Sequence, residues 1–169
     1  RLFYECKAAV RGKEEWLAEL KSACAAQRDN SEHRIAVCVG SKTQLREVCQ
    51  LLTENGVSCK PYSGETHEGY RLDDLKDPDH SWLEVGSVVS TTTLSIGVDP
   101  KQVQFARVFM WTCRMGCNVI SQAQAVMRFG RSASAPLLNT TIDILVDCME
   151  PSLRATLVDA KKLAPLAIR

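Results

Sequence analysis

The sequence predicts an α/β domain in three layers, with a mostly parallel β-sheet flanked by helices. Short apolar runs of strand length alternate along the chain with segments whose apolar residues recur at helical spacing. Residues 35–62 in particular read as strand, helix and strand, which is the pattern of a parallel βαβ unit. The length of 169 residues suits one such domain with its own hydrophobic core.

The first half of the chain predicts two helices and two strands. Residues 13–28 have the apolar spacing of a helix, and Ser41 and Gln44 form a capping box that opens a second helix, which ends at Asn55 and Gly56. The polar stretch 66–80 carries four aspartates and is interpreted as a solvated helix-and-turn segment, not as a metal loop. The strands are expected at residues 35–39 and 57–62.

The second half continues the alternation. A helix with an apolar face is expected from Val119 to Met127, ending near Gly130, and Pro151 suits the first turn of a last helix. Residues 1–33 are interpreted as a linker helix that leads into a single lobe over residues 34–169. The chain opens at Arg1 without an initiator Met, so we expect a piece of a longer protein. The remaining strands are expected at residues 88–91, 107–111 and 142–146.

Composition excludes several classes of protein. The 21 Lys and Arg against 20 Asp and Glu leave a net charge of +1, so no overall positive field drives nonspecific phosphate binding. Hydrophobic residues at 45% exclude a disordered chain. No uncharged run approaches the roughly 18 residues of a membrane helix, so no membrane partner is expected. The eight cysteines form no C-x-x-C pair; we expect reduced, mostly buried thiols in an intracellular, reducing compartment, the nucleus included, and we assign no metal.

Loops beyond the carboxyl ends of parallel strands are where such domains bind ligands. That rule singles out residues 40–42, 62–66 and 90–99, and the loop after Trp111, which combine small or hydroxylated residues with strand ends. Hydroxyls and exposed backbone N–H groups suit phosphate oxygens, although each segment taken alone reads equally well as caps and turns. The phosphate-binding pattern G-x-x-x-x-G-K-[ST] and the dinucleotide pattern G-x-G-x-x-G are both missing.

The most informative segment is residues 122–131. Arg128 and Arg131 lie three apart near the end of an apolar-faced helix, with Gly130 between them. Two converging arginines can clamp a phosphate, but the spacing alone fits two solvated arginines equally well.

The order of these segments resembles the second, C-terminal RecA-like lobe of superfamily 2 helicases. Residues 35–52 look like motif IV of that family, and residues 62–65 resemble the next motif. Residues 90–99 resemble motif V, and residues 124–131 resemble motif VI, written Q-x-x-G-R-x-G-R. The segment 77–82, with the valines, threonines and Cys-containing loop that follow it, is further similar to the replication-origin-binding helicases of the herpesvirus type.

The resemblance implies a RecA-like fold of the P-loop NTPase type and a role for each matching residue. ATP with Mg²⁺ would bind between this lobe and an N-terminal RecA-like lobe of the same protein, which would carry the missing phosphate loop. Arg131 would be the arginine finger, beside Arg128 and Gln124, in catalysis. The nucleotide would be contacted by Gly97, Asp99, Arg128 and Arg131. The backbone of single-stranded DNA, with RNA left open, would be contacted by Ser41, Lys42, Ser63, Gly64, Thr91 and Thr92.

Two departures keep alternatives open. Met127 stands where motif VI has Gly, and a shifted register would replace its last Arg by Ser134. Ile96 stands where motif V often has Arg. A catalytically silent lobe that serves as a nucleic-acid or protein docking module is therefore the second hypothesis, and a small-ligand α/β domain of another family is the third. The resemblance implies that the full protein hydrolyses ATP, whereas this piece alone is expected to be inactive. The process that it implies is replication-origin unwinding.

Overall fold

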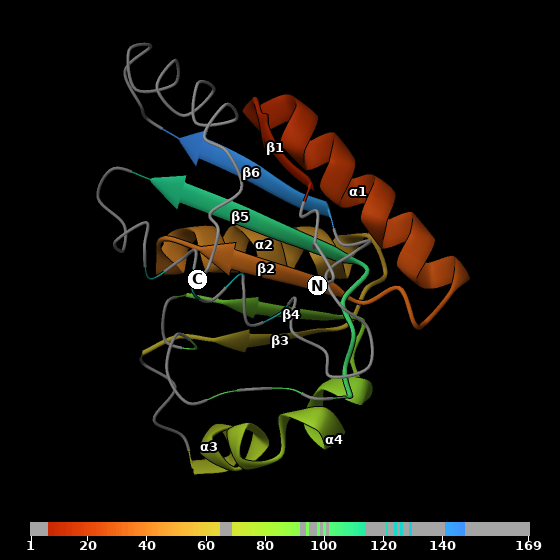
Figure 1. Cartoon of the computed structure of the whole chain (residues 1–169), viewed down its shortest axis with the longest axis vertical. Coiled ribbons are helices and arrows are strands. Elements are labelled where there is room, and N and C mark those ends of the chain that lie inside the picture. Colours follow the sequence, from red (N-terminus) through yellow and green to blue (C-terminus); the bar gives the residue numbers. More distant parts are fainter. Residues whose placement is uncertain are drawn as a thin grey trace, which may run out of the picture.

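The computed structural model describes residues 7–64, 69–91, 94, 98, 100, 102–113, 121, 124, 126, 129 and 141–147. Its centre is a six-stranded sheet in which every strand pair is parallel, in the order β1-β6-β5-β2-β4-β3 (Figure 1). The strands are β1 (Lys7–Arg11), β2 (Ile35–Val39), β3 (Cys59–Tyr62), β4 (Ser87–Ser90), β5 (Arg107–Cys113) and β6 (Thr141–Asp147). The predicted parallel α/β sheet is confirmed.

Two longer helices cover one face of the sheet. They are α1 (Lys13–Asp29) and α2 (Lys42–Glu54), and their apolar sides close a core with the inward side chains of the central strands. Trp16 of α1 is fully buried and packs edge-on to Phe109 of β5, with ring centroids 5.5 Å apart. Both predicted helices are confirmed, because their apolar spacing matches the sheet-facing side of each helix.

The opposite face of the sheet is covered by a second core cluster. It includes Trp82, from the short helix α4 (Pro78–Leu83), and Phe105 and Phe129, whose rings pack edge-on at 5.2 Å. Residues 121, 124, 126 and 129 are helical, where the sequence predicts a helix. The sheet is therefore buried on both faces, which is why its strands read as continuous apolar runs.

The first strand is the main departure from the sequence-based elements. β1 was not predicted; it pairs with β6 in parallel, Ala9 opposite Asp143, and forms one edge of the sheet. The segment expected to lead into the lobe thus packs on the same sheet, through β1 and through Trp16 and Leu20 of α1. The helix predicted from Pro151 lies outside the described residues.

The polar stretch after β3 forms two short helices, as predicted for its described part. α3 (Gly69–Lys76) and α4 lie beyond the β3 edge of the sheet (Figure 1). Asp77 caps α4 by accepting a 3.2 Å hydrogen bond from the backbone N–H of His80. Asp79 accepts from the N–H groups of Gln102 and Val103, at 2.8 and 3.0 Å, so these aspartates have structural partners. No helix in the described part of the chain has the length and apolarity of a membrane span.

Candidate nucleic-acid interface

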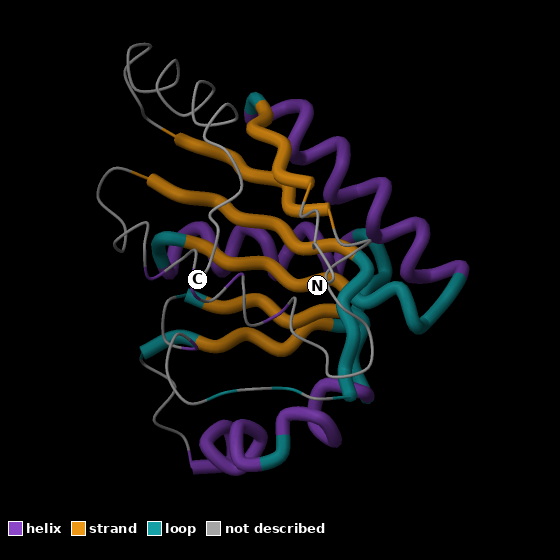
Figure 2. Tube along the Cα trace, viewed as in Figure 1, coloured by secondary structure: helices purple, strands orange, loops and turns teal. Residues whose placement is uncertain are grey.

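Strand order brings three of the predicted contact loops to one edge. β2, β4 and β3 are neighbours, with Cys38 and Tyr62 both opposite Ser90. Adjacent strands lie about 4.8 Å apart, so the residues that follow them begin within roughly two strand spacings of one another. Figure 2 shows the loops after these strands, in teal, stacked at the left-hand edge of the sheet. The Ser41–Lys42, Ser63–Gly64 and Thr91 segments therefore form one continuous edge, here called the carboxyl edge.

The loop after β2 is held from both sides. The backbone N–H of Gly40 donates to the carbonyl of Trp111 at 2.9 Å and to the side-chain Oε1 of Gln44, also at 2.9 Å. The Ser41 hydroxyl accepts from the N–H of Gln44 at 3.2 Å and caps α2. The predicted capping pair is thus confirmed, with one difference: the buried Gln44 side chain reaches back to Gly40.

Lys42 follows as the first residue of α2, with its side chain exposed. The N-terminal end of a helix carries partial positive charge, and a flexible ammonium group there adds a full one. Ser41 beside it is half-buried. This corner of the carboxyl edge combines a hydroxyl, a lysine and a helix N-terminus, which is chemistry suited to a phosphate oxygen.

The loops after β3 and β4 are joined to each other. The N–H of Thr91 donates to the carbonyl of Tyr62 at 3.0 Å, which extends the strand pairing by one residue. Ser63 is half-buried and Gly64 is exposed, whereas Thr91 is only 8% exposed. The surface of this part of the edge is therefore formed by Ser63 and Gly64. Direct contact between Thr91 and a nucleic-acid strand stays a prediction.

A hydrogen-bonded group centred on Tyr62, the residue before Ser63, was not foreseen from the sequence. The Tyr62 hydroxyl accepts from the indole nitrogen of Trp82 at 3.0 Å and donates to a carboxylate oxygen of Asp74 at 3.3 Å. The ammonium group of Lys60 lies 3.4 Å from the same carboxylate oxygen. Trp82 in an otherwise polar stretch was the available signal, because a large aromatic there predicts an anchor into the core.

The residues predicted for catalysis and nucleotide binding, together with Thr92 of the predicted nucleic-acid contacts, fall mostly outside the described residues. Gln124 is described: it is helical and exposed, while Val126 and Phe129 close to it in sequence are buried in the second core cluster. Its predicted role stays a prediction. The same holds for the five others, which lie outside the described residues: Thr92, Gly97, Asp99, Arg128 and Arg131.

Charged groups elsewhere on the sheet serve the fold. The carboxylate of Asp143 on β6 is fully buried and accepts from Nε of Arg11 at 2.6 Å and from Nη2 of Arg107. Hydrogen bonding to Asp143 raises the pKa of Arg11. For Arg107, burial lowers the pKa, but its hydrogen bonds to Asp143 and Glu19 outweigh that effect and the pKa is raised. Among the described side chains, no three His, Cys, Asp or Glu residues come together as a metal site.

No protein-family model matches this chain, and no curated protein matches it either.

Comparison by structure is informative. Domain 2 of a DEAD-box helicase, solved bound to an RNA duplex, superposes with a TM-score of 0.64 at 15% identity over 93% of this chain and 60% of that one. The helicase MrfA bound to DNA gives 0.62 at 18% identity, over 92% of this chain and 22% of that one. The Hef helicase domain from Pyrococcus furiosus gives 0.55 at 15% identity, over 85% and 28% respectively.

These likenesses show the fold. The chain is a RecA-like α/β domain, the fold that it shares with these three solved helicase structures. It spans less than two thirds of the length of each of those three proteins.

Proposed function

We propose that this chain is the second RecA-like lobe of an ATP-dependent superfamily 2 DNA helicase. In this proposal the carboxyl edge holds the sugar-phosphate backbone of a single strand, and ATP with Mg²⁺ binds between this lobe and an N-terminal RecA-like lobe. The observation that carries the proposal is the adjacency of the Ser41–Lys42, Ser63–Gly64 and Thr91 segments on neighbouring parallel strands.

Hydroxyls, backbone N–H groups and one exposed lysine contact phosphates without reading bases. This fits a motor that must move along any sequence. It also fits the near-neutral charge of the chain, because local groups replace a broad positive field. Two solved helicases of this fold are described as bound to DNA and to an RNA duplex, which supports a nucleic-acid ligand for this chain.

ATP hydrolysis is the second part of the proposal. Closure of the two lobes would bring Arg131 to the γ-phosphate, with Arg128 and Gln124 beside it and Gly97 and Asp99 at the nucleotide. A positioned arginine neutralises the charge that spreads over the phosphoryl oxygens during transfer. The helicase MrfA, whose structure is similar to this chain, was also solved bound to DNA and AMPPNP, which supports a nucleotide as the second ligand. The Mg²⁺ would be bound mainly by the first lobe.

Replication-origin unwinding is the most specific part of the proposal. It is supported by the resemblance of residues 77–82 and the segments after them to the origin-binding helicases of the herpesvirus type. In the structure Asp77 caps α4 and Trp82 is buried, so these two residues stabilise the folded conformation of that segment.

Binding of a fluorescein-labelled single strand, followed by anisotropy from about 50 to 200 mM salt, tests the strand-binding edge. Lys42→Ala should weaken binding on the order of three- to tenfold for single strands of unrelated base sequence. It should also lower the slope of the logarithm of the binding constant against the logarithm of salt concentration by about 0.7. Lys21→Ala is the matched control, because Lys21 is exposed on α1 away from the carboxyl edge. Equal losses in both variants would contradict binding at this edge.

A further inference from the structure

Two partly exposed thiols meet where α2 packs on β3. Cys49 lies on α2 and Cys59 opens β3, and both flank the core cluster that α2 closes. The Sγ of Cys59 lies 4.0 Å from the carbonyl oxygen of Cys49. The Thr53 hydroxyl donates to that same carbonyl at 2.9 Å. The two cysteines are thus neighbours that come from different elements and reach the surface together.

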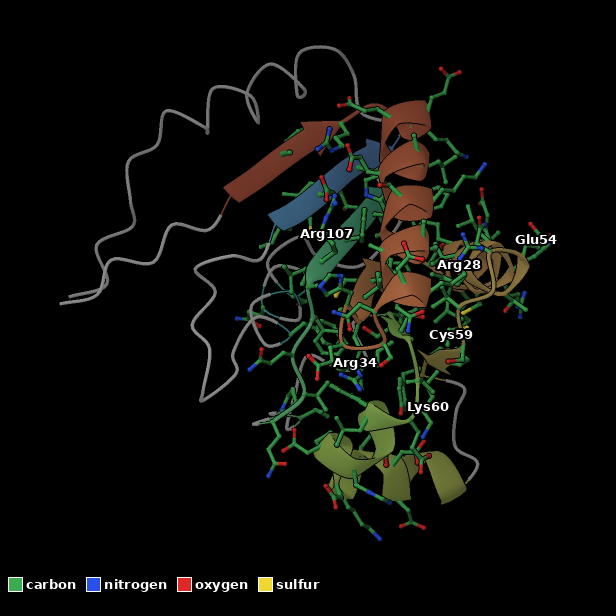
Figure 3. The ribbon with its side chains drawn as sticks, turned by 90° about the vertical axis from the view of Figure 1, so that its right-hand side faces the viewer. Arg28, Arg34, Glu54, Cys59, Lys60 and Arg107 are labelled. Carbon is green, nitrogen blue, oxygen red and sulfur yellow. The ribbon has the colours of Figure 1, made fainter. Side chains whose placement is uncertain are left out.

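The surroundings activate one of the two thiols. A hydrogen bond from the Cys49 thiol lowers the pKa of Cys59 to about 7, against burial, with a smaller contribution from Thr53. Figure 3 shows Cys59 between the labelled side chains of Arg28, at the end of α1, and Lys60, with Glu54 farther out at the end of α2. The thiolate is the form that reacts with oxidants, so Cys59 has the character of an attacking sulfur.

The other described thiols differ in accessibility. Cys24 and Cys38 are buried, and burial raises their pKa values to about 11 and about 12. Oxidation selects thiols by thiolate character and exposure. Cys59 is therefore set apart from these two buried cysteines on both counts, and Cys49 is set apart by its exposure.

We propose that Cys49 and Cys59 form a reversible redox site that closes to a disulfide when hydrogen peroxide is present. The Cys59 thiolate attacks one peroxide oxygen, the O–O bond breaks, and a sulfenic acid and hydroxide form. The Cys49 sulfur then attacks the Cys59 sulfur, its proton leaves with the hydroxyl as water, and an S–S bond forms. Two electrons pass from the two sulfurs to the peroxide, and a dithiol reductant reverses the reaction.

The bond would link α2 to an edge strand. α2 begins at Ser41–Lys42 and β3 ends next to Ser63–Gly64, so the two elements support two parts of the carboxyl edge. Closing a loop of this length restrains the unfolded chain, and the melting temperature should rise by about 5–10 °C on oxidation.

Peptide mapping of the peroxide-treated chain tests the site. Free thiols are blocked with N-ethylmaleimide after a peroxide titration, and the digest is analysed by mass spectrometry without reduction. We expect a disulfide-linked peptide that joins Cys49 to Cys59 at the lowest peroxide concentration that oxidises any of Cys24, Cys38, Cys49 and Cys59. Treatment with a dithiol reductant should remove this linked peptide.

Three variants make the assignment specific. Cys59→Ser should abolish the linked peptide, and Cys49→Ser should stop at a Cys59 sulfenic acid that dimedone labels. Cys24→Ala is the matched control and should leave the linkage intact. The proposal is overturned if no disulfide forms between Cys49 and Cys59. It is also overturned if the disulfide forms equally well in the urea-unfolded chain, because the folded packing would then contribute nothing.

Discussion

The indole nitrogen of Trp82 donates a 3.0 Å hydrogen bond to the hydroxyl of Tyr62, and both side chains are 1% exposed. Trp82 belongs to α4 and Tyr62 ends β3, so this bond ties the helical segment beyond the sheet to the strand that leads into Ser63–Gly64. A predicted nucleic-acid contact thus depends on a buried aromatic pair for its position.

Tyr62→Phe should therefore destabilise the fold. The change keeps the ring but leaves the Trp82 N–H buried without its acceptor and removes the bond to Asp74, at a cost of about 1–3 kcal/mol. Urea unfolding followed by Trp fluorescence measures the free energy of unfolding. Asp74→Asn retains the indole bond and should cost less. A loss below about 0.5 kcal/mol for Tyr62→Phe would show that the bond is dispensable.

The buried carboxylate on β6 gives a second prediction. Asp143→Asn keeps the size of the side chain but leaves the guanidinium groups of Arg11 and Arg107 without their buried countercharge. Removing one partner of a buried pair costs about 3–5 kcal/mol.

The control for this change is Asp73→Asn. Asp73 pairs with Lys76 at 2.6 Å, but both side chains are more than two thirds exposed, so the loss should be at most about 1 kcal/mol. The same urea titration compares the two variants. Equal losses for Asp143→Asn and Asp73→Asn would contradict the structural role of the Arg11–Asp143–Arg107 group.

The thiols predict a specific pH dependence of alkylation. Cys59 should react with iodoacetamide with a half-maximal rate near pH 7, because its pKa is lowered to about 7. Cys24 and Cys38, with pKa values raised to about 11 and about 12, should stay unmodified below pH 9 while the chain is folded. Mass spectrometry of timed digests reads each site separately. A Cys59 midpoint near pH 9, the value of an ordinary thiol, would contradict its activation.

The same pKa shifts determine whether the free energy of unfolding rises or falls with pH. The lowered pKa of Cys59 adds stability above pH 9, and that contribution is lost as pH falls from about 9 to about 7. The raised values of Cys24 and Cys38 act oppositely: their contributions are present below pH 9 and are lost as pH rises toward 11 and 12. Cys38→Ala should therefore weaken the loss of stability above pH 9.

Much of the fold follows from local pattern. The apolar run at residues 35–39 and the Ser41 cap predicted β2 and the start of α2, because both depend on neighbours in sequence. β1 was missed because it is short, begins with Lys7 and ends with Arg11, and gains its partner only from β6, far along the chain.

The site follows from the sequence only in part. The carboxyl-edge rule correctly placed Ser41, Lys42, Ser63 and Gly64 at one edge of the sheet, because parallel strands present their ends on one side, while their contact with nucleic acid stays a prediction. It could not foresee that Thr91 is buried, since a hydroxyl at a strand end reads as exposed. The Tyr62–Trp82 bond and the Cys49–Cys59 contact depend on how helices pack on β3, which no spacing along the chain encodes.

The central claim is that this lobe completes an ATPase, and DNA-stimulated hydrolysis by the full-length protein tests it most directly. Arg131→Ala should lower the rate about 10³-fold or more while leaving strand binding within about twofold. Arg28→Ala is the control, because Arg28 is exposed at the end of α1, and it should hydrolyse ATP at the unmodified rate. Hydrolysis retained in Arg131→Ala would contradict the account and favour a lobe that only docks.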